Sequence, residues 1–427
     1  MVGSNKAGSV VSVYLKNGKI YNGTIIKRYE FADQDYITLK LENGYNISIK
    51  KDEIEKIEEK SFVSFKLPKI SLEKEEKNIT IISTGGTITS RVDYITGGVE
   101  PLTNPENFLV YFPELVDKAN FEIINAFSKL SEDIEPKDWI KLSEIIFNKL
   151  NEGIEGVIVT HGTDTLHYSA AAISFMIEGS KPIAFTAAQR SSDRPSTDAI
   201  MNMIASTDYV LNDFGEVAIV MHKSLNDNEL FAIRGVRAKK MHSSRRDTFR
   251  PINDLPIAEF YYDLNTKKLE NLKIIRKLKK KGEIKGLKNS FEEKVALIKY
   301  YPGFNKEIID LLVDKGFKGI VIEGTGFGHV STLNKDLLKS LERAAEELII
   351  LMTTQTTYGS TNSFVYSTAR KLSNLGILYG KDMLSEVAFV KLGWLLSFND
   401  KNEVKKLILK NFVGEIKENL NYKEFLN

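Results

Sequence analysis

Short apolar runs that alternate with helical stretches constrain the fold of this chain more than any other feature of its sequence. Four such runs, rich in β-branched residues, lie at 79–82, 156–160, 182–186 and 217–221. Continuous apolar runs of this kind are typical of strands buried on both faces of a sheet. The stretches 139–150 and 165–177 carry apolar residues at helical spacing. This alternation predicts an α/β body with a doubly wound parallel sheet.

The first 66 residues follow a different pattern. Short runs of alternating apolar and polar residues are broken at Asn17-Gly18 and Asn43-Gly44. Asn-Gly pairs favour the tight turns of β-hairpins. We therefore predict a small SH3-like antiparallel β-barrel of about five strands over residues 1–66. Such barrels commonly bind a ligand or dock on a neighbouring domain.

Two polar stretches divide the rest of the chain. The charged residues of 67–78 lack an apolar period and predict an interdomain linker. A second linker is predicted at 272–290, where Lys, Gly and Glu dominate. A chain of 427 residues is long enough for two or three domains. We expect a large α/β domain at 79–271 and a smaller C-terminal α/β domain at 291–427.

Composition excludes several classes of site. The chain contains no cysteine, which rules out a disulfide framework, thiolate zinc sites and a cysteine nucleophile. Its formal net charge of +2 gives no strong argument for a nucleic-acid or membrane partner. Its five histidines show no metal-binding spacing. No apolar stretch approaches the roughly 18 residues of a transmembrane helix, and the N-terminus lacks a signal-peptide pattern. We expect a cytoplasmic protein without a metal site or membrane partner.

Three polar segments directly follow predicted strands, where open α/β sheets bind their ligands. They lie at 83–89, 160–165 and 234–244. The first places two glycines among threonines, so that backbone amides and hydroxyls can approach a ligand closely. Each segment also has a simpler interpretation. These are a plain turn for the first, helix capping for the second and a solvated charged face for the third.

Taken together, the three segments resemble the active-site motifs of the L-asparaginase family, over about residue 78 to the C-terminus. The matching motifs are Thr84-Gly85-Gly86-Thr87-Ile88, His161-Gly162-Thr163-Asp164-Thr165 and Lys240-x-His242-Ser243. The resemblance implies that Thr87 is the nucleophile that attacks a side-chain amide carbon, with Tyr94 as a mobile residue near it. It further implies that Thr163, Asp164 and Lys240 form a second triad, in which a neutral lysine takes a hydroxyl proton.

The same resemblance implies a set of substrate contacts. Ser131 and Asp133 correspond to residues that grip the α-carboxylate and nearby groups, and Asp164 to one that contacts the α-amino group. The backbone at Gly86 would help to stabilise the tetrahedral oxyanion. Glu132 stands where secreted asparaginases have glutamine. Activation by a base suits this chemistry, because a threonine hydroxyl is a weak nucleophile and base assistance is worth roughly 10²–10⁴ in rate.

The N-terminal extension indicates which branch of the asparaginase family the chain resembles. Ordinary asparaginases begin close to their first motif, whereas here that motif begins only at Thr84. A small barrel joined to an asparaginase body resembles the asparaginase-like subunits of archaeal glutamyl-tRNA(Gln) amidotransferases, as does the segment 365–372. The resemblance implies a threonine-dependent glutaminase or asparaginase with a homodimeric core inside a heterotetramer. A partner subunit would handle tRNA(Gln) and use ATP and Mg²⁺, and this chain itself would need no cofactor.

Two alternatives stay open. The first is a free-standing cytoplasmic L-asparaginase that turns over asparagine without a partner. The second is a catalytically idle binding module, in which the barrel docks RNA or protein.

Overall fold

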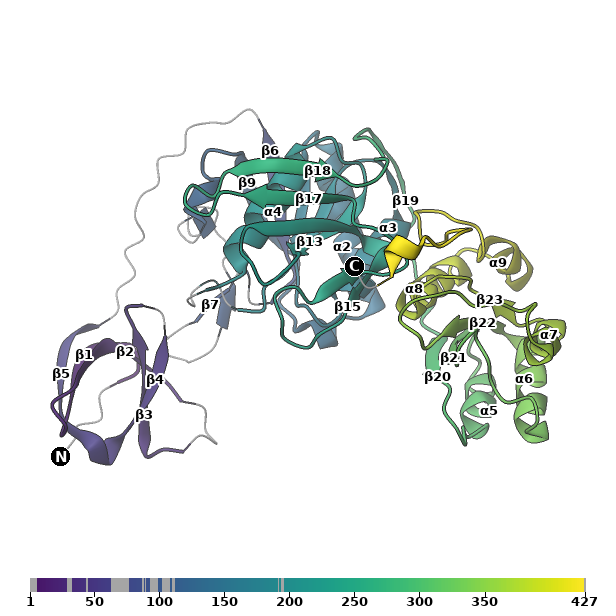
Figure 1. The fold of residues 1–427 in the computed structure, drawn as a ribbon, viewed down its shortest axis with the longest axis horizontal. Helices are drawn as coiled ribbons and strands as arrows, with labels where there is room; N and C mark the ends of the chain where they lie inside the picture. Colours follow the sequence, from purple (N-terminus) through teal and green to yellow (C-terminus); the bar gives the residue numbers. More distant parts are fainter. Residues whose placement is uncertain are drawn as a thin grey trace.

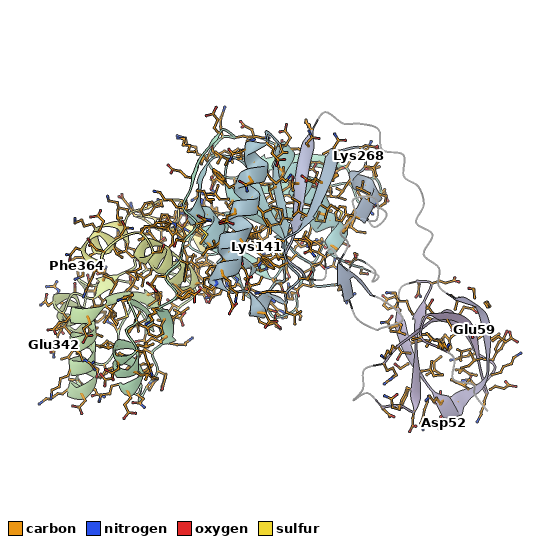
Figure 2. All side chains as sticks on the ribbon, turned by 180° about the vertical axis from the view of Figure 1, so that it is seen from behind. Asp52, Glu59, Lys141, Lys268, Glu342 and Phe364 are labelled. Atoms are coloured by element: carbon orange, nitrogen blue, oxygen red, sulfur yellow. The ribbon has the colours of Figure 1, made fainter. Side chains whose placement is uncertain are left out.

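The computed structural model describes residues 6–28, 33–43, 45–62, 77–86, 88, 90–92, 99–101, 108–109, 112–190, 192 and 196–425. They form a small all-β domain, a large α/β domain and a smaller C-terminal α/β domain (Figure 1). Figure 2 shows the all-β domain, which bears Asp52 and Glu59, at one end of the molecule. The C-terminal domain, which bears Glu342 and Phe364, lies at the other end.

The N-terminal domain is a five-stranded antiparallel sheet in the order β4-β3-β2-β1-β5. Its strands are β1 (Ser9–Leu15), β2 (Ile20–Ile26), β3 (Tyr36–Leu41), β4 (Asn46–Lys50) and β5 (Ile54–Phe62). The predicted Asn17-Gly18 turn joins β1 to β2, and Gly18 has the positive φ of 82° that such a turn needs. The inward-facing residues of alternate positions form one apolar core. The five predicted antiparallel strands are confirmed.

The large domain is built on an eight-stranded sheet in the order β18-β17-β14-β13-β12-β10-β6-β9. These strands are β6 (Asn78–Ser83), β9 (Asn120–Asn125), β10 (Gly156–Thr160), β12 (Ile183–Thr186), β13 (Val217–His222), β14 (Glu229–Arg234), β17 (Ala258–Tyr262) and β18 (Leu269–Ile274). Shorter strands pair outside it: β7 (Ser90–Val92) with β8 (Val99–Pro101), β11 (Ile177–Gly179) with β19 (Ile284–Leu287), and β15 (Ala238–Lys240) with β16 (Phe249–Pro251).

Both faces of this sheet are covered by helices. Helix α4 (Ala199–Leu211) packs on one face, while α2 (Pro136–Asn151) and α3 (Leu166–Met176) pack on the other. Successive residues of β10 point to opposite faces: Ile158 lies in the core under α4, and Val157 and Val159 lie in the core under α2 and α3. This two-sided burial explains why the strands are continuous apolar runs.

The sheet is only partly parallel. Strands β9, β6, β10, β12 and β13 run parallel, whereas β14, β17 and β18 are antiparallel. The apolar runs predict β6, β10, β12 and β13 but not β9. The reversal follows from the short connection of residues 223–228 between β13 and β14. A connection of this length can close a hairpin but cannot make the crossover that a parallel pair requires.

The C-terminal domain contains a four-stranded parallel sheet in the order β20-β21-β22-β23. Its strands are β20 (Val295–Lys299), β21 (Gly319–Gly324), β22 (Ile349–Thr354) and β23 (Leu378–Tyr379), and its helices are α5 (Glu307–Asp314), α6 (Lys335–Glu347), α7 (Ser367–Asn374), α8 (Ser385–Leu396) and α9 (Lys401–Leu407). Helix α8 shares one apolar core with α3 of the large domain, where Phe175 and Trp394 stack with ring centroids 5.5 Å apart. None of the described helices is long and apolar enough to cross a membrane.

The segment 272–290, interpreted from sequence as a linker, contributes to the structure of both domains. It contains the end of β18 and all of β19, which pairs with β11. Its Lys288 carbonyl accepts a hydrogen bond of 3.0 Å from the indole nitrogen of Trp394 on α8. Backbone pairing therefore fixes much of this polar stretch.

A fully buried ion pair fastens the C-terminal tail to α8. Lys391 Nζ lies 2.7 Å from Glu415 Oε1, and both side chains are inaccessible to solvent. Burial lowers the pKa of Lys391, although the neighbouring Glu415 opposes that shift. The Glu415 carboxylate also accepts hydrogen bonds from the backbone amides of Phe412 and Val413.

We predict that Lys391→Met lowers the free energy of unfolding by about 3–5 kcal/mol, because it leaves a buried carboxylate without its countercharge. Guanidinium unfolding would measure the loss. Lys406→Met is the matched control, since Lys406 pairs with Glu403 at the surface, and it should cost less than about 1 kcal/mol. Equal costs for the two variants would contradict this account.

Candidate functional site

Three loops meet at the carboxyl edge of the parallel strands. They follow β6, β9 and β10, which are neighbours in the sheet. The loops are joined by backbone hydrogen bonds: the Thr84 amide donates to the Thr160 carbonyl at 3.1 Å, and the Lys129 amide donates to the Thr84 carbonyl at 3.1 Å. The predicted segments at 83–89 and 160–165 are therefore brought together, with a third loop beside them.

Glycines permit the close approach of these loops. A Cβ at Gly85 would collide with the Lys129 backbone, and one at Gly86 would lie 3.0 Å from the amide nitrogen of Gly162. A Cβ at Gly162 would lie 2.7 Å from the Cβ of Ser131. Gly85 and Gly86 also have positive φ values of 111° and 82°, which residues with a Cβ rarely adopt. The Gly-Gly motif is thus needed for more than a plain turn.

Thr163, Asp164 and Lys240 lie in direct contact. Lys240 Nζ lies 2.8 Å from Thr163 Oγ1 and 2.6 Å from Asp164 Oδ1. The lysine side chain is only 11% exposed, whereas that of Asp164 is 63% exposed. The lysine comes from β15, and the other two residues come from the loop before α3. Side chains 76 residues or more apart in the chain therefore form one polar group.

This group has the geometry for proton exchange between a hydroxyl and an amine. A charged Lys240 can donate to both oxygens, which gives charge-assisted hydrogen bonds. After losing a proton, the same nitrogen could accept the hydroxyl proton of Thr163 at 2.8 Å. Among the described residues no cluster of histidine, aspartate and glutamate could hold a metal ion.

Ser131 lies at the contact of the loops, and Asp133 lies beside it. Ser131 is buried, and its Oγ accepts a hydrogen bond of 3.2 Å from the Asp164 amide. Its carbonyl accepts one of 2.5 Å from Thr165 Oγ1. Asp133 ends the 3₁₀ turn η3 (Ser131–Asp133) with an exposed side chain. The structure thus joins Ser131 to the group of Thr163, Asp164 and Lys240. Thr87 and Tyr94 lie outside the described residues.

His161 connects the loop after β10 to helices α2 and α3 through a network of hydrogen bonds. Its Nδ1 lies 2.7 Å from the Gly162 carbonyl and its Nε2 lies 2.8 Å from Ser169 Oγ. Trp139 Nε1 donates to the same hydroxyl at 2.9 Å. Burial lowers the pKa of His161 to about 4, so the ring is neutral near neutral pH. A neutral ring can donate from Nδ1 and accept at Nε2, which satisfies both neighbours.

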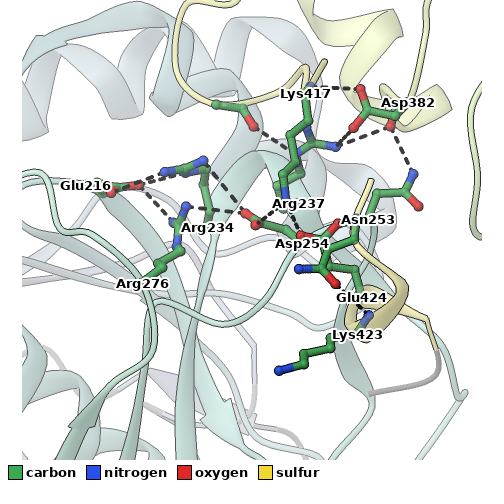
Figure 3. A network of polar contacts seen from close by, with 12 residues as sticks. Glu216, Arg234, Arg237, Asn253, Asp254, Arg276, Asp382, Lys417, Lys423 and Glu424 are labelled. Carbon is green, nitrogen blue, oxygen red and sulfur yellow. Dashed lines mark hydrogen bonds and ion pairs between the residues drawn. The ribbon is translucent and has the colours of Figure 1, made fainter. Parts of the chain in front are cut away.

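The C-terminal domain anchors the segment that carries Lys240. The sequence analysis did not predict this contact between the two domains. Figure 3 shows Arg237 directed at Asp382. Both side chains are buried, and Arg237 Nη1 lies 2.8 Å from Asp382 Oδ2. Arg237 Nε also donates to the Gly414 carbonyl at 2.8 Å. The interpretation of the third segment as a solvated charged face is wrong for Arg237, and only the tertiary fold reveals its partners.

Comparisons with known proteins match all three parts of the chain. The family model described as the GatD N-terminal domain matches residues 5–59. The models for "Asparaginase, N-terminal" and "Glutaminase/Asparaginase C-terminal domain" match residues 78–271 and 294–408.

Two curated relatives align over nearly the full length. The D subunit of the glutamyl-tRNA(Gln) amidotransferase from Pyrococcus furiosus is 46% identical, and the alignment covers 93% of this chain and 91% of the relative. The protein of the same name from Methanobrevibacter smithii is 43% identical, with coverages of 95% and 93%. Among solved structures, the thermostable L-asparaginase from Thermococcus kodakarensis aligns with a TM-score of 0.72 and 26% identity, and covers 80% of this chain and 100% of its own.

We predict that Gly162→Ala lowers the free energy of unfolding by about 1–3 kcal/mol, because the new Cβ would overlap Ser131 and push the two loops apart. Gly286→Ala is the control: its Cβ would make only an ordinary contact of 3.6 Å, so the change should stay within about 0.5 kcal/mol. Denaturant unfolding of both variants checks the difference. A Gly162→Ala protein as stable as the control would show that the loop contact is not tight.

A second prediction concerns acid stability. His161 has a pKa of about 4 in the folded chain against about 6.5 when unfolded. The unfolded chain binds the proton first, so stability should fall as the pH drops from about 6.5 to about 4, by up to about 1.4 kcal/mol per pH unit from this group. His167 has a similarly lowered pKa, also caused mainly by burial. Unfolding at pH 6.5, 5.5 and 4.5 should show a shallower loss for His161→Gln than for the parent. Equal slopes would exclude a neutral His161.

Proposed function

Since this chain belongs to the family of glutamyl-tRNA(Gln) amidotransferase D subunits, we propose that it releases ammonia from the side-chain amide of glutamine or asparagine. The observation that carries the proposal is the contact of Lys240 with both Thr163 and Asp164, at the edge of the sheet where two glycine-rich loops meet. An amide-hydrolysing site needs a hydroxyl nucleophile, a base and oxyanion donors. Threonines of these loops offer the hydroxyl, and Lys240 of β15 offers the base.

The proposed reaction has two halves. A threonine hydroxyl, for which Thr87 is the candidate, attacks the amide carbon and forms a C–O bond as its proton passes to the base. The tetrahedral oxyanion collapses, the C–N bond breaks, and the departing nitrogen takes a proton and leaves as ammonia. Water then hydrolyses the acyl ester. Lys240, held by Thr163 and Asp164, is the candidate base and acid, and Tyr94 is proposed to assist near Thr87.

Substrate binding is assigned to the loop contact. The Ser131 hydroxyl and the carboxylates of Asp133 and Asp164 offer polar groups for the backbone end of an amino-acid substrate. Asp164 is well exposed although it pairs with Lys240, so its second oxygen can meet an ammonium group. The backbone at Gly86, which packs on Gly162, is proposed to line the amide end.

The proposed setting is a complex. The ammonia would pass to a partner subunit that holds tRNA(Gln) and activates its glutamate with ATP and Mg²⁺, while this chain needs no cofactor. A homodimeric core in a cytoplasmic heterotetramer is part of the proposal. A free-standing L-asparaginase is less well supported, because the N-terminal domain matches the GatD model. The T. kodakarensis L-asparaginase covers only 80% of this chain.

Two neighbouring lysines provide the test. Lys240→Met should lower kcat for ammonia release by at least about 10²-fold without a comparable loss of stability. Lys239 instead pairs with Glu386 at 2.5 Å, so Lys239→Met should cost stability while changing kcat little. Ammonia release and thermal melts of the two variants separate these effects. Near-parental turnover by Lys240→Met would remove this lysine from the mechanism.

A further inference from the structure

A cavity of about 430 Å³ lies at the opposite edge of the large domain from Lys240 and Thr163. It is bounded by the amino ends of β12 and β13, the end of β14, the segment 279–285 and the C-terminal tail at Phe412 and Val413. Helix α3 separates it from the candidate active site. The helix starts just after Thr163, and Ser174 near its other end lines the cavity. Eleven helical residues span about 16 Å, so the two sites are distinct.

Three lysines line this cavity, in addition to Arg234. Lys181 Nζ donates to the carbonyls of Leu150 and Ile154, at 3.0 and 2.8 Å. Lys279 Nζ donates to the Gly179 carbonyl at 2.5 Å. Lys285 lies beside them. Across the described part of the chain, none of the three lysines forms an ion pair with a carboxylate.

The two carboxylates of the wall, Glu178 and Glu216, offset only part of this charge. Glu216 lines the cavity, but Arg234 holds it at 2.7 Å and Arg276 at 3.2 Å. Figure 3 shows both guanidinium groups directed at this carboxylate. Glu178, the other acidic residue in the wall, has an exposed side chain. The wall therefore carries an excess of positive charge.

Partial burial of the lysines makes this excess of positive charge energetically unfavourable. Partial withdrawal from water lowers the pKa of Lys181 and that of Lys279, with Lys281 adding to the shift at Lys181. A bound anion would supply the missing countercharge. The remaining wall is mainly apolar, with Ser174 and Ser180 beside the apolar residues Ile177, Ile183, Val217, Ile284, Phe412 and Val413. A cavity of this size and mixed lining is typical of a small-molecule site.

We propose that this cavity binds a small organic anion, in which a phosphate or carboxylate group meets Lys181, Lys279 and Lys285 and an apolar body packs against Phe412 and the aliphatic wall. The site is independent of the proposed ammonia release. Lysine ammoniums bind either anion as point charges, so the probes must distinguish the two.

Calorimetric titration of the full-length chain with adenosine monophosphate, benzoate and neutral adenosine tests the proposal. We expect one of the two anions to bind, and its identity will show whether the cavity prefers a phosphate or a carboxylate group. Neutral adenosine should bind much more weakly. Lys279→Gln/Lys285→Gln should raise the Kd of that anion about tenfold. Lys280→Gln/Lys288→Gln, which removes the same charge outside the cavity, should leave the Kd nearly unchanged.

Three outcomes would overturn the proposal. They are failure of both anions to bind at millimolar concentration, equal binding of adenosine, and equal Kd values for the two double variants. Thermal melts show whether each variant is folded, so that loss of binding can be separated from loss of structure.

Discussion

Backbone contact between the loops at Gly85, Gly86 and Gly162 is the constraint on which the candidate site depends. Side chains at these positions would hold the loops after β6, β9 and β10 apart by the width of a Cβ. With glycine there, Ser131 can accept a hydrogen bond from the backbone of Asp164, and the polar residues of separate loops lie side by side. Of the strands below, β6 and β10 are buried on both faces and give the loops a fixed base.

Helix α3 links this contact to the rest of the molecule. Its first turn follows Thr163 and Asp164, its side packs against α8 of the C-terminal domain, and the segment 235–240 runs beside it. The Arg237 anchor to Asp382 then joins that segment to the C-terminal domain. Lys240 is therefore positioned by both α/β domains. This explains how a nearly buried lysine is held in contact with the exposed side chain of Asp164.

Sequence patterns predicted the elements that local chemistry determines. The apolar runs located β6, β10, β12 and β13 but not β9, and the glycine and threonine motifs located two of the three loops that meet. Patterns failed where distant segments decide the structure. The antiparallel strands β14, β17 and β18 depend on a short hairpin connection, and β19 lies in a polar stretch that gains its order by pairing with β11. Arg237 and Asp382 are 145 residues apart, so no local signal distinguishes this buried pair from a solvated charge.

The most direct test of the account is ammonia release from glutamine and from asparagine by the purified chain, with and without its partner subunit and glutamate-charged tRNA. The account predicts release from at least one amide, with stimulation by the complete complex. Fast release from asparagine that the partner leaves unchanged would contradict the amidotransferase setting. Absence of release under every condition would contradict an amidohydrolase site built from Thr163, Asp164 and Lys240.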